Sequence, residues 1–481
     1  MRTLPRPTYR FQGRFTPRDK AKSDYHYLRF DVPAGTERID VRYTYEGPGP
    51  EGNTIDIGLF DARGDNADGF RGWSGGARDR FTVAEQDATP GYLPGLLPPG
   101  QWSIILGLYK IRETGCRWQV DVWLWPDASQ GCGFPTVRLP RAERGQSSRP
   151  ARSSGAPDDS GPRWYRGDFQ THTYHSDAQG SPGDLAAVAR ARELDFIAVT
   201  DHNTISQVPH LRTLSGRDLL LIPGIEVTTY YGHANVWGTD RWLEFRCRTR
   251  EDVEHVIEEA HQHGLLFSIN HPKEGGPPWE YGFDLPFDCM EVWQGPWIMR
   301  NWESRRRWMD LLEQGRRVVA VGGSDRHQPP FYGVLGFYEL GTPTTWVYAD
   351  ALTQEAILAG VRAGHVFISE SPAGPRIELT AEANGRTAMM GDELPCREAS
   401  EVLVYVRVLG ASGKMLWLLT RSGLAEALLI TGDDFECTAQ IPIDAGFVWA
   451  EVVYPESEWG DLPGHAPRLA AMGNPIYLAQ R

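Results

Sequence analysis

The sequence predicts a multidomain protein in which a central α/β barrel is flanked by an all-β sandwich at each end. Apolar and polar residues alternate with a period of two in residues 1–145 and again in residues 371–481, which is typical of half-buried strands. Between these regions, short apolar runs alternate with helical patterns, which indicates a parallel sheet. A chain of 481 residues is also too long for one core and suggests roughly two to four domains.

Residues 1–145 are predicted to form an antiparallel β-sandwich. Ile39, Val41 and Tyr43 alternate with polar residues, and the same period recurs between Ile55 and Leu59. Turn signals rich in proline and glycine separate these runs. Burying one face of each strand then requires a second sheet packed against the first.

The composition changes on both sides of the predicted barrel. Residues 146–163 are rich in Ser, Arg, Pro, Gly and Asp and hold too few apolar residues to build a core, so we expect a flexible linker there. In residues 371–481 the helical patterns fade, and Val402, Val404 and Val406 alternate with other side chains as in a strand. A second, C-terminal β-sandwich is therefore expected.

Residues 164–370 combine strand and helix signals. Ser181, Pro182 and Asp184 form the pattern of a helix N-cap with proline at the first helical position. Thr249 and Asp252 repeat the capping pattern before a run of apolar residues at helical spacing. A repeated alternation of strand and helix predicts a parallel sheet, here a closed or nearly closed barrel.

The composition argues against several classes of protein. A formal net charge of −14 argues against a scaffold that binds duplex nucleic acid. No apolar run reaches the roughly 18 residues that cross a bilayer, and the N-terminus lacks the apolar segment of a secretory signal, so we expect a cytoplasmic protein without a membrane partner. The six cysteines are widely spaced and form neither a disulfide framework nor a zinc knuckle. The sequence does not indicate an oligomeric state.

Histidine and acidic residues follow five successive strand-like runs of the central region. In parallel β/α barrels the C-terminal ends of the strands form one face, so these side chains are expected to converge. Neutral imidazole and carboxylate groups bind divalent ions such as Zn²⁺ or Mn²⁺. The pattern therefore predicts a metal-dependent hydrolase. The residues concerned are His172, Asp177, Asp201, His202, Glu226, His233, His271, Asp325 and His327.

The order of these residues resembles the PHP (polymerase and histidinol phosphatase) family of metallohydrolases. The resemblance covers roughly residues 167–370, and the flanking β regions with the G-N-P-I-Y-L ending look similar to the CehA/McbA branch of that family. Each motif alone is weak, whereas six motifs in the family's order are specific. The motifs are H-T-x-x-S-D (His172–Asp177), T-D-H (Thr200–His202), G-x-E (Gly224–Glu226), G-H (Gly232–His233), N-H-P (Asn270–Pro272) and S-D-x-H (Ser324–His327).

The resemblance implies a PHP-type (β/α)7 barrel that holds two or three divalent metal ions, which are Zn, Mn or Fe. It also implies that Glu226 bridges two ions, and a bridging carboxylate can hold ions about 3.5 to 4 Å apart with a shared hydroxide as nucleophile. The resemblance implies three ligand sets, one for each ion: His172, Glu226 and Asp325; Glu226, His233 and His271; and Asp177, His202 and His327.

Gln170 departs from the family pattern, because the first motif of the family usually reads His-x-His and glutamine stands here at its first position. An amide oxygen is a weaker, uncharged ligand than imidazole. Three alternatives remain open: Gln170 binds a metal through oxygen, hydrogen-bonds the bridging water, or leaves an enzyme with two ions.

Three residues are candidates for catalysis. Glu226 carries the bridging role. His175 is a candidate proton donor to the leaving group, although a solvated loop histidine is the favoured interpretation. Arg326 is a candidate clamp for an anionic substrate, and its alternative is a structural ion pair. Asp201 is expected to orient ligands rather than bind metal.

The expected reaction is hydrolysis of a small phosphorylated ester by a metal-bridging hydroxide. The CehA/McbA resemblance points to a second reaction, hydrolysis of a carbamate or carboxylic ester. A third hypothesis, of another class, is a catalytically degenerate, metal-stabilised binding protein. Gln170 and the seventeen tryptophans favour that hypothesis, and the otherwise complete ligand set opposes it.

Overall fold

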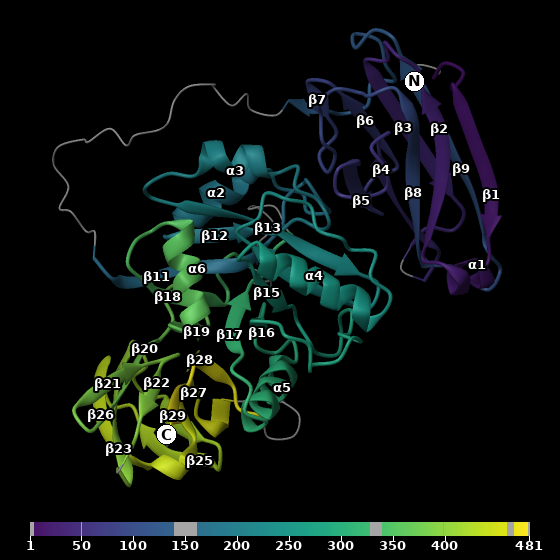
Figure 1. The fold of residues 1–481 in the computed structure, drawn as a ribbon. Coiled ribbons are helices and arrows are strands. Elements are labelled where there is room, and N and C mark those ends of the chain that lie inside the picture. The colour runs from purple at the N-terminus through teal and green to yellow at the C-terminus, as the bar shows by residue number, and fades with distance from the viewer. Residues whose placement is uncertain are drawn as a thin grey trace, which may run out of the picture.

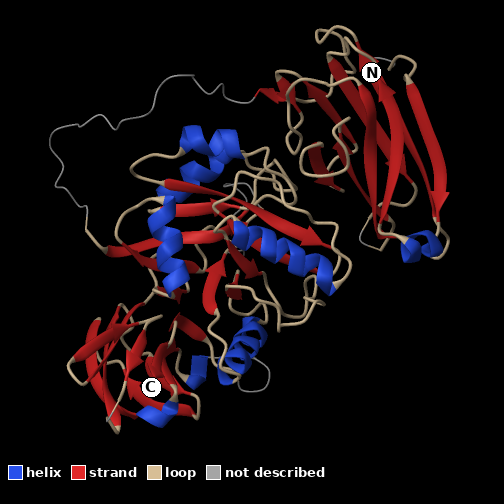
Figure 2. Ribbon diagram, viewed as in Figure 1, coloured by secondary structure: helices blue, strands red, loops and turns tan. Residues whose placement is uncertain are grey.

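The computed structural model describes residues 4–49, 51–138, 161–327, 339–397, 399–458 and 466–479 (Figure 1). Residues 146–160 of the predicted linker lie outside the described residues. The described chain is rich in strands and has few helices, as Figure 2 shows, which confirms a β-rich multidomain protein. None of its helices is both long enough and apolar enough to cross a bilayer. The α-helices are α1 (Pro17–Lys22), α2 (Pro182–Ala191), α3 (Val208–Leu214), α4 (Arg250–Gln262), α5 (Asn301–Glu313) and α6 (Gln354–Ala363).

The N-terminal region consists of two antiparallel sheets that share one core. Alternate residues of β3, among them Ile39, Val41 and Tyr43, are buried, as the period of two predicts. Side chains from both sheets meet in this core, including Leu106 and Val120. One sheet has the order β1 (Tyr9–Phe15), β9 (Cys116–Trp125), β3 (Arg38–Tyr45), β6 (Arg80–Ala84), β7 (Asp87–Ala88), β10 (Val137–Arg138). The other has the order β2 (Tyr25–Val32), β8 (Gly100–Lys110), β4 (Thr54–Phe60), β5 (Phe70–Gly75).

The central region is built on one continuous sheet. Strands β11, β12 and β13 are parallel, β14 runs antiparallel to both of its neighbours, and β15, β16 and β17 are again parallel. The strands are β11 (Arg163–Thr171), β12 (Phe196–Val199), β13 (Leu220–Thr229), β14 (Gly232–Trp237), β15 (Leu266–Ile269), β16 (Cys289–Gln294), β17 (Val319–Gly323), β18 (Thr344–Ala349) and β19 (Val366–Ser369).

The first and last strands of this series meet, but a (β/α)7 barrel is not confirmed. A bridge joins Thr171 to Arg326, and the Asp325 N–H donates to the Gln170 carbonyl over 2.9 Å, so the chain after β17 lies against the end of β11. The described residues hold six α-helices in all, and β14 is antiparallel, so the structure does not show seven strand–helix repeats. The seven-fold form of the barrel stays a prediction.

The two capping signals in the central region begin helices where the sequence predicts them. Ser181 accepts a hydrogen bond from the Asp184 N–H at the start of α2, and Thr249 and Asp252 form the same box at α4. In α4 the apolar positions at helical spacing, such as Val253 and Ile257, are buried against the sheet. The local sequence therefore predicts where both helices begin.

The C-terminal region consists of two packed sheets, one of which continues the central sheet. Strand β19 pairs with β28, and Asn474 ties β17 to β19 through hydrogen bonds to the backbone of Ala320 and Val366. The continuing strands are β28 (Leu469–Gly473), β27 (Phe447–Val453), β24 (Met415–Thr420) and β25 (Gly423–Leu429), with β22 (Glu393–Pro395) and β29 (Ile476–Ala479) beside them. A second sheet packs on this one in the order β21 (Arg386–Met389), β20 (Arg376–Ala383), β23 (Glu401–Leu409), β26 (Asp434–Pro442). Two short 3-10 turns, Ile443–Ala445 and Glu456–Glu458, complete the region.

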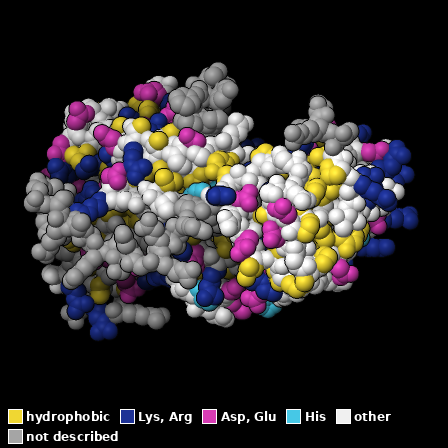
Figure 3. All heavy atoms as spheres, turned by 90° about the horizontal axis from the view of Figure 1, so that it is seen from above, with side chains coloured by type: hydrophobic (Ala, Val, Ile, Leu, Met, Phe, Trp, Pro, Cys, Tyr) yellow, Lys and Arg dark blue, Asp and Glu magenta, His cyan; other side chains and the backbone are white. Residues whose placement is uncertain are grey.

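The N-terminal sandwich packs directly on the central region. Phe70 of β5 stacks on Trp242 with ring centroids 4.7 Å apart, and Trp73 lies 4.6 Å from Phe245. These side chains belong to one buried core that spans both regions. Figure 3, seen from above, shows the sandwich on the right adjoining the central region, with histidine side chains visible close to the boundary.

A buried ion pair joins α5 to the C-terminal region. Arg305 donates two hydrogen bonds, of 2.6 and 2.8 Å, to the two carboxylate oxygens of Glu451 on β27. Glu451 is fully buried and also accepts from the indole N–H of Trp449. Because both charges are paired in a fixed fork, the pair holds the helix against the sheet.

We predict that Arg305→Ala lowers the free energy of unfolding by about 3 to 5 kcal/mol, because Glu451 would keep a buried charge without its partner. Urea denaturation followed by tryptophan fluorescence measures the change. The neighbouring Arg306 pairs with Asp310 at the surface, where 79% of the Arg306 side chain is exposed. Arg306→Ala is the matched control, and an equal effect of both variants would contradict a special role for the buried pair.

Candidate metal centre

The predicted metal-binding residues lie at one edge of the central sheet. The C-terminal ends of its parallel strands point to this edge, and β14 begins there because it is antiparallel. The sheet topology therefore gathers residues that are far apart in the sequence. His172 follows β11, His202 follows β12, Glu226 lies in β13, His233 lies in β14, His271 follows β15, and Asp325 and His327 follow β17.

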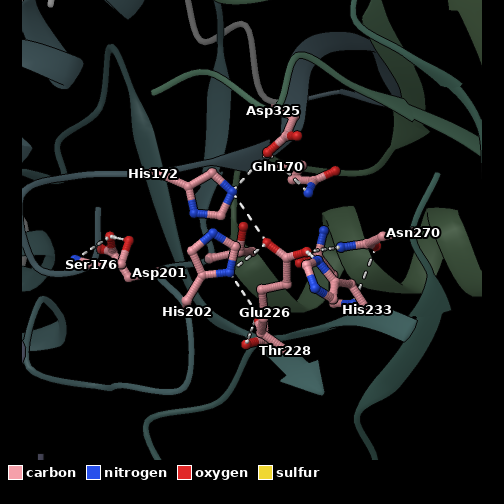
Figure 4. Close-up of polar contacts among 12 residues, drawn as sticks. Gln170, His172, Ser176, Asp201, His202, Glu226, Thr228, His233, Asn270 and Asp325 are labelled. Carbon is pink, nitrogen blue, oxygen red and sulfur yellow. Dashed lines mark hydrogen bonds and ion pairs between the residues drawn. The ribbon is translucent and has the colours of Figure 1, made fainter. Parts of the chain in front are cut away.

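Glu226 is the centre of the arrangement (Figure 4). Its carboxylate is fully buried, and Oε2 lies 3.2 Å from both His172 Nε2 and His202 Nδ1. Oε1 lies 3.0 Å from His233 Nδ1 and 3.7 Å from His271 Nε2. One carboxylate thus contacts imidazoles from four different strand ends.

The described residues form three overlapping groups suited to hold a metal ion, with all ligand atoms of each group within 4.8 Å of one another. The group of His172, Glu226 and Asp325 is one combination that the resemblance implies. The implied combination of Asp177, His202 and His327 is also present, with His172 as a fourth member. In the second set His202 lies where His271 was expected. The groups are His172, Glu226 and Asp325; His202, Glu226 and His233; and His172, Asp177, His202 and His327.

Two observations test whether these residues fit a cation. Both ring nitrogens of His172, Glu226 Oε2 and Gln170 Oε1 are buried and have no hydrogen-bond partner among the described residues. His172 Nε2 nevertheless lies 3.2 Å from Glu226 Oε2 and 3.0 Å from Asp325 Oδ1. Two ligands at right angles, each about 2.1 Å from an ion, lie about 3.0 Å apart. The atoms are therefore spaced as ligands of one ion are, and the donor set fits a divalent metal.

The pKa shifts agree with this fit. Burial raises the pKa of the Glu226 carboxyl, but the surrounding histidines outweigh burial and hold it well below its usual range. Burial lowers the pKa of His202 to about 4, so this imidazole is neutral at pH 7, as a ligand must be. At His172, burial lowers the pKa while Asp325 and Glu226 raise it well above the ordinary value. These carboxylates favour a positive charge at His172 Nε2, whether a proton or a metal ion.

Two side-chain amides hold the Asp325 carboxylate. The Nε2 of Gln170 donates to Asp325 Oδ1 over 3.2 Å, and the Nε2 of Gln294 donates to Oδ2 over 2.8 Å. Gln170 therefore orients a candidate ligand, and its buried Oε1 has no hydrogen-bond partner among the described residues. The motifs do not include Gln294, and no sequence pattern predicted it.

Further residues around the ligands were not predicted from the sequence motifs. Asn270 Nδ2 donates to Glu226 Oε1 over 3.1 Å, and Thr228 Oγ1 lies 2.5 Å from His202 Nδ1. Glu291 accepts a 2.9 Å hydrogen bond from the His271 N–H, and burial raises the pKa of its carboxyl well above the usual range. An acidic residue inside the apolar run of β16 is the signal that identifies Glu291.

Asp201 organises the loop between His172 and Asp177. Its Oδ1 accepts from the N–H groups of Thr173 and Ser176 and from the Ser176 hydroxyl, and its Oδ2 accepts from the Thr173 hydroxyl. Asp201 is fully buried. Its contacts are with this loop, in agreement with the expectation that it orients ligands.

Backbone strain gathers at the site. Asp325 and His271 adopt positive φ angles of 52° and 29°, and so do Asn203 beside His202 (54°) and Arg300 (60°). Such conformations are unfavourable for residues other than glycine, and they persist where the surrounding structure imposes them for function. No sequence pattern signals them.

The structure corrects one interpretation and qualifies another. His175 is not a solvated loop histidine: it is fully buried, and its Nδ1 lies 2.8 Å from Ser206 Oγ, outside the three donor groups. Arg326 is also buried, which lowers the pKa of its guanidinium against the opposing effect of Glu339 and Asp168. As placed, Arg326 does not line the cavity of the site.

The donor groups open into a cavity of about 390 Å³. Apart from the donor residues, the lining of this cavity combines charged and apolar side chains. Among the described residues no tryptophan lines this cavity, and Trp237 and Trp293 are buried in the cores. The lining residues other than the donors are Lys273, Glu274, Gly275, Gly276, Pro277, Gln294, Ile298, Met299 and Arg300.

No family model matches the chain, and no curated protein matches it. Among solved structures, it is similar to a two-domain protein of Bacteroides vulgatus that contains a predicted PHP-like metal-dependent phosphoesterase, with 18% identity, 62% of this chain and 92% of that chain covered, and a TM-score of 0.36. A proposed metal-dependent phosphoesterase of Bifidobacterium adolescentis has 15% identity, coverages of 36% and 90%, and a TM-score of 0.29. An amidohydrolase of Chromobacterium violaceum with bound sulfate and no metal has 13% identity, coverages of 34% and 88%, and a TM-score of 0.26. At these TM-scores the similarities assign neither the fold nor the chemistry.

We predict that Glu226→Gln weakens binding of Mn²⁺ at least about 100-fold, because two of the three donor groups lose a charged ligand. Titration calorimetry of the metal-free protein measures the affinity. Glu258→Gln, on the exposed face of α4, is the matched control and should bind as the wild type does. Equal affinity of Glu226→Gln and the wild type would exclude Glu226 as a ligand.

Proposed function

We propose that the chain is a metal-dependent hydrolase of PHP type, with two or three divalent ions (Zn, Mn or Fe) in the three donor groups around Glu226. The observation that carries this proposal is the buried Glu226 carboxylate, which lies within ligand range of histidines from four strand ends. Buried polar atoms at this site that have no hydrogen-bond partner among the described residues support the same proposal, because burying such an atom costs free energy.

Bound divalent ions would neutralise charge on the reacting group and activate water at neutral pH. The protein's own residues hold the candidate ligands in position. Glu226 stays ionised among its histidines, Asn270 orients its Oε1, and Gln170 and Gln294 orient Asp325. These contacts fix the ligands before substrate binds, which lowers the cost of reaching the reactive geometry.

Lys273 favours a phosphoester as the substrate. Its ammonium lines the cavity beside the ligands and donates to two neutral oxygens, Asn301 Oδ1 at 2.7 Å and the Gln294 carbonyl at 3.2 Å. An ammonium has three donors, and no carboxylate hydrogen-bonds to this one among the described residues. By contrast, Arg300, which also lines the cavity, is paired with Glu274 at 2.7 Å. Lys273 thus offers positive charge to an anionic group of the substrate.

The rim of the cavity suits an apolar leaving group and supports a second candidate reaction. Ile298 is 54% exposed, and Met299 and Pro277 also line the cavity. An exposed apolar side chain beside a polar site provides a contact for an organic group. The same rim would accept an aryl carbamate or carboxylic ester of the CehA/McbA type, which is the second candidate. A degenerate metal-stabilised binding protein is the candidate of another class.

The protein loaded with Mn²⁺ or Zn²⁺ is expected to hydrolyse an aryl phosphomonoester or phosphodiester, and a chelator should abolish turnover until metal is restored. Elemental analysis and a panel containing both phosphoesters and an aryl carbamate provide the test. Turnover of the carbamate alone would replace the first candidate by the second. Less than one equivalent of metal, together with no turnover of any substrate, would favour the metal-stabilised binding protein over both enzymes.

We predict that Lys273→Met weakens binding of inorganic phosphate to the metal-loaded protein about 10- to 100-fold, since one charge-assisted hydrogen bond is lost. It should raise KM for an aryl phosphate similarly. Titration calorimetry and steady-state kinetics measure the two quantities, and a neutral carbamate ligand serves as the internal control. Unchanged phosphate affinity would assign Lys273 a structural role only.

A further inference from the structure

The N-terminal sandwich contacts the loop that carries Asp177. Arg78, in the turn between β5 and β6, donates through its guanidinium to the carbonyl oxygens of Tyr174 and Ser176, the latter at 2.8 Å. These two carbonyls flank His175, and that of Ser176 directly precedes Asp177. A planar guanidinium with several fixed donors is well suited to hold two carbonyls at once.

A second contact of the sandwich acts on the same loop. The Gly91 N–H donates to Ser206 Oγ over 3.0 Å, and its carbonyl accepts from Thr204 Oγ1 over 3.0 Å. Ser206 Oγ in turn lies 2.8 Å from His175 Nδ1. Gly91 has a φ of +97°, and a Cβ at this position would lie 2.9 Å from the His175 carbonyl oxygen. Only glycine permits this approach, so the buried His175 joins the sandwich to the metal-site loop.

The position of Asp177 depends on the backbone of this loop. Its Oδ1 lies 3.1 Å from His327 Nε2 and 3.5 Å from His202 Nε2, yet 49% of its side chain is exposed. Packing alone therefore does not fix the carboxylate. Asp201 holds the loop from within the central region, and Arg78 holds it from the sandwich.

We propose that the N-terminal sandwich is a functional part of the metal centre, and that Arg78 is a positioning residue that presents Asp177 to the donor group of His172, His202 and His327. This inference rests on the proposed metal-dependent function. It assigns the sandwich a role in metal retention, which neither its fold nor the metal-binding motifs indicate.

The test compares Arg78→Ala with Asp177→Asn in the full chain. After saturation with Mn²⁺ and dialysis, both variants are expected to retain one equivalent less metal than the wild type, and the double variant should lose no more than either. The affinity for the remaining ions should be unchanged. Arg80→Ala is the matched control, because Arg80 lies only two positions from Arg78 but pairs with Asp79 at the surface, so this variant should keep the wild-type metal content.

Arg78→Lys provides a milder variant in case removal of the guanidinium prevents folding. Lysine keeps the charge but lacks the fork, so the last ion should bind about tenfold more weakly, at unchanged thermal stability of the metal-free protein. Wild-type affinity in both Arg78 variants, or equal metal content of Asp177→Asn and the wild type, would overturn the inference. A wild-type protein without bound metal would instead overturn the proposed function itself.

Discussion

The rest of the site depends on one electrostatic constraint, the burial of the Glu226 carboxylate. A carboxylate removed from water is costly unless positive charge compensates it. Here histidines from four strand ends approach its two oxygens, and Asp325 and Asp177 add further negative charge nearby. Imidazoles alone can supply this compensation only when protonated, and His202 stays neutral. Divalent cations satisfy the whole set at once, which is why the geometry favours a metal centre.

A second layer of contacts makes the centre rigid. Asn270, Gln294 and Asp201 each direct a ligand or the loop that carries one, and none of them needs to bind a metal. The positive φ angles of His271 and Asp325 show that the backbone accepts strain to place these side chains. Such strain is affordable only because the surrounding sheet is extensively hydrogen-bonded and buried.

The flanking β regions are integrated with the central sheet rather than tethered to it. The C-terminal strands extend that sheet, and Asn474 of the G-N-P-I-Y-L ending bonds to β17, the strand that precedes Asp325. The N-terminal sandwich shares an aromatic core with the central region and reaches the first metal-site loop. Both flanking regions therefore support the strand ends on which the ligands lie.

The sequence by itself determined the alternating strands, the capped helices α2 and α4, and the residue types of the site, because period, caps and short motifs are local signals. It identified Glu226 and its histidines through their order along the chain. Only the tertiary structure decided that β14 is antiparallel, that the C-terminal sheet continues the central one, and that His175 is buried. It also placed His202 in one donor group with Glu226 and His233. The continuation of the sheet and the burial of His175 depend on contacts between residues more than about 20 positions apart, for which a single sequence carries no periodic signal. Strand β14 differs, because it is antiparallel through a local hairpin in which Thr229 pairs with Gly232.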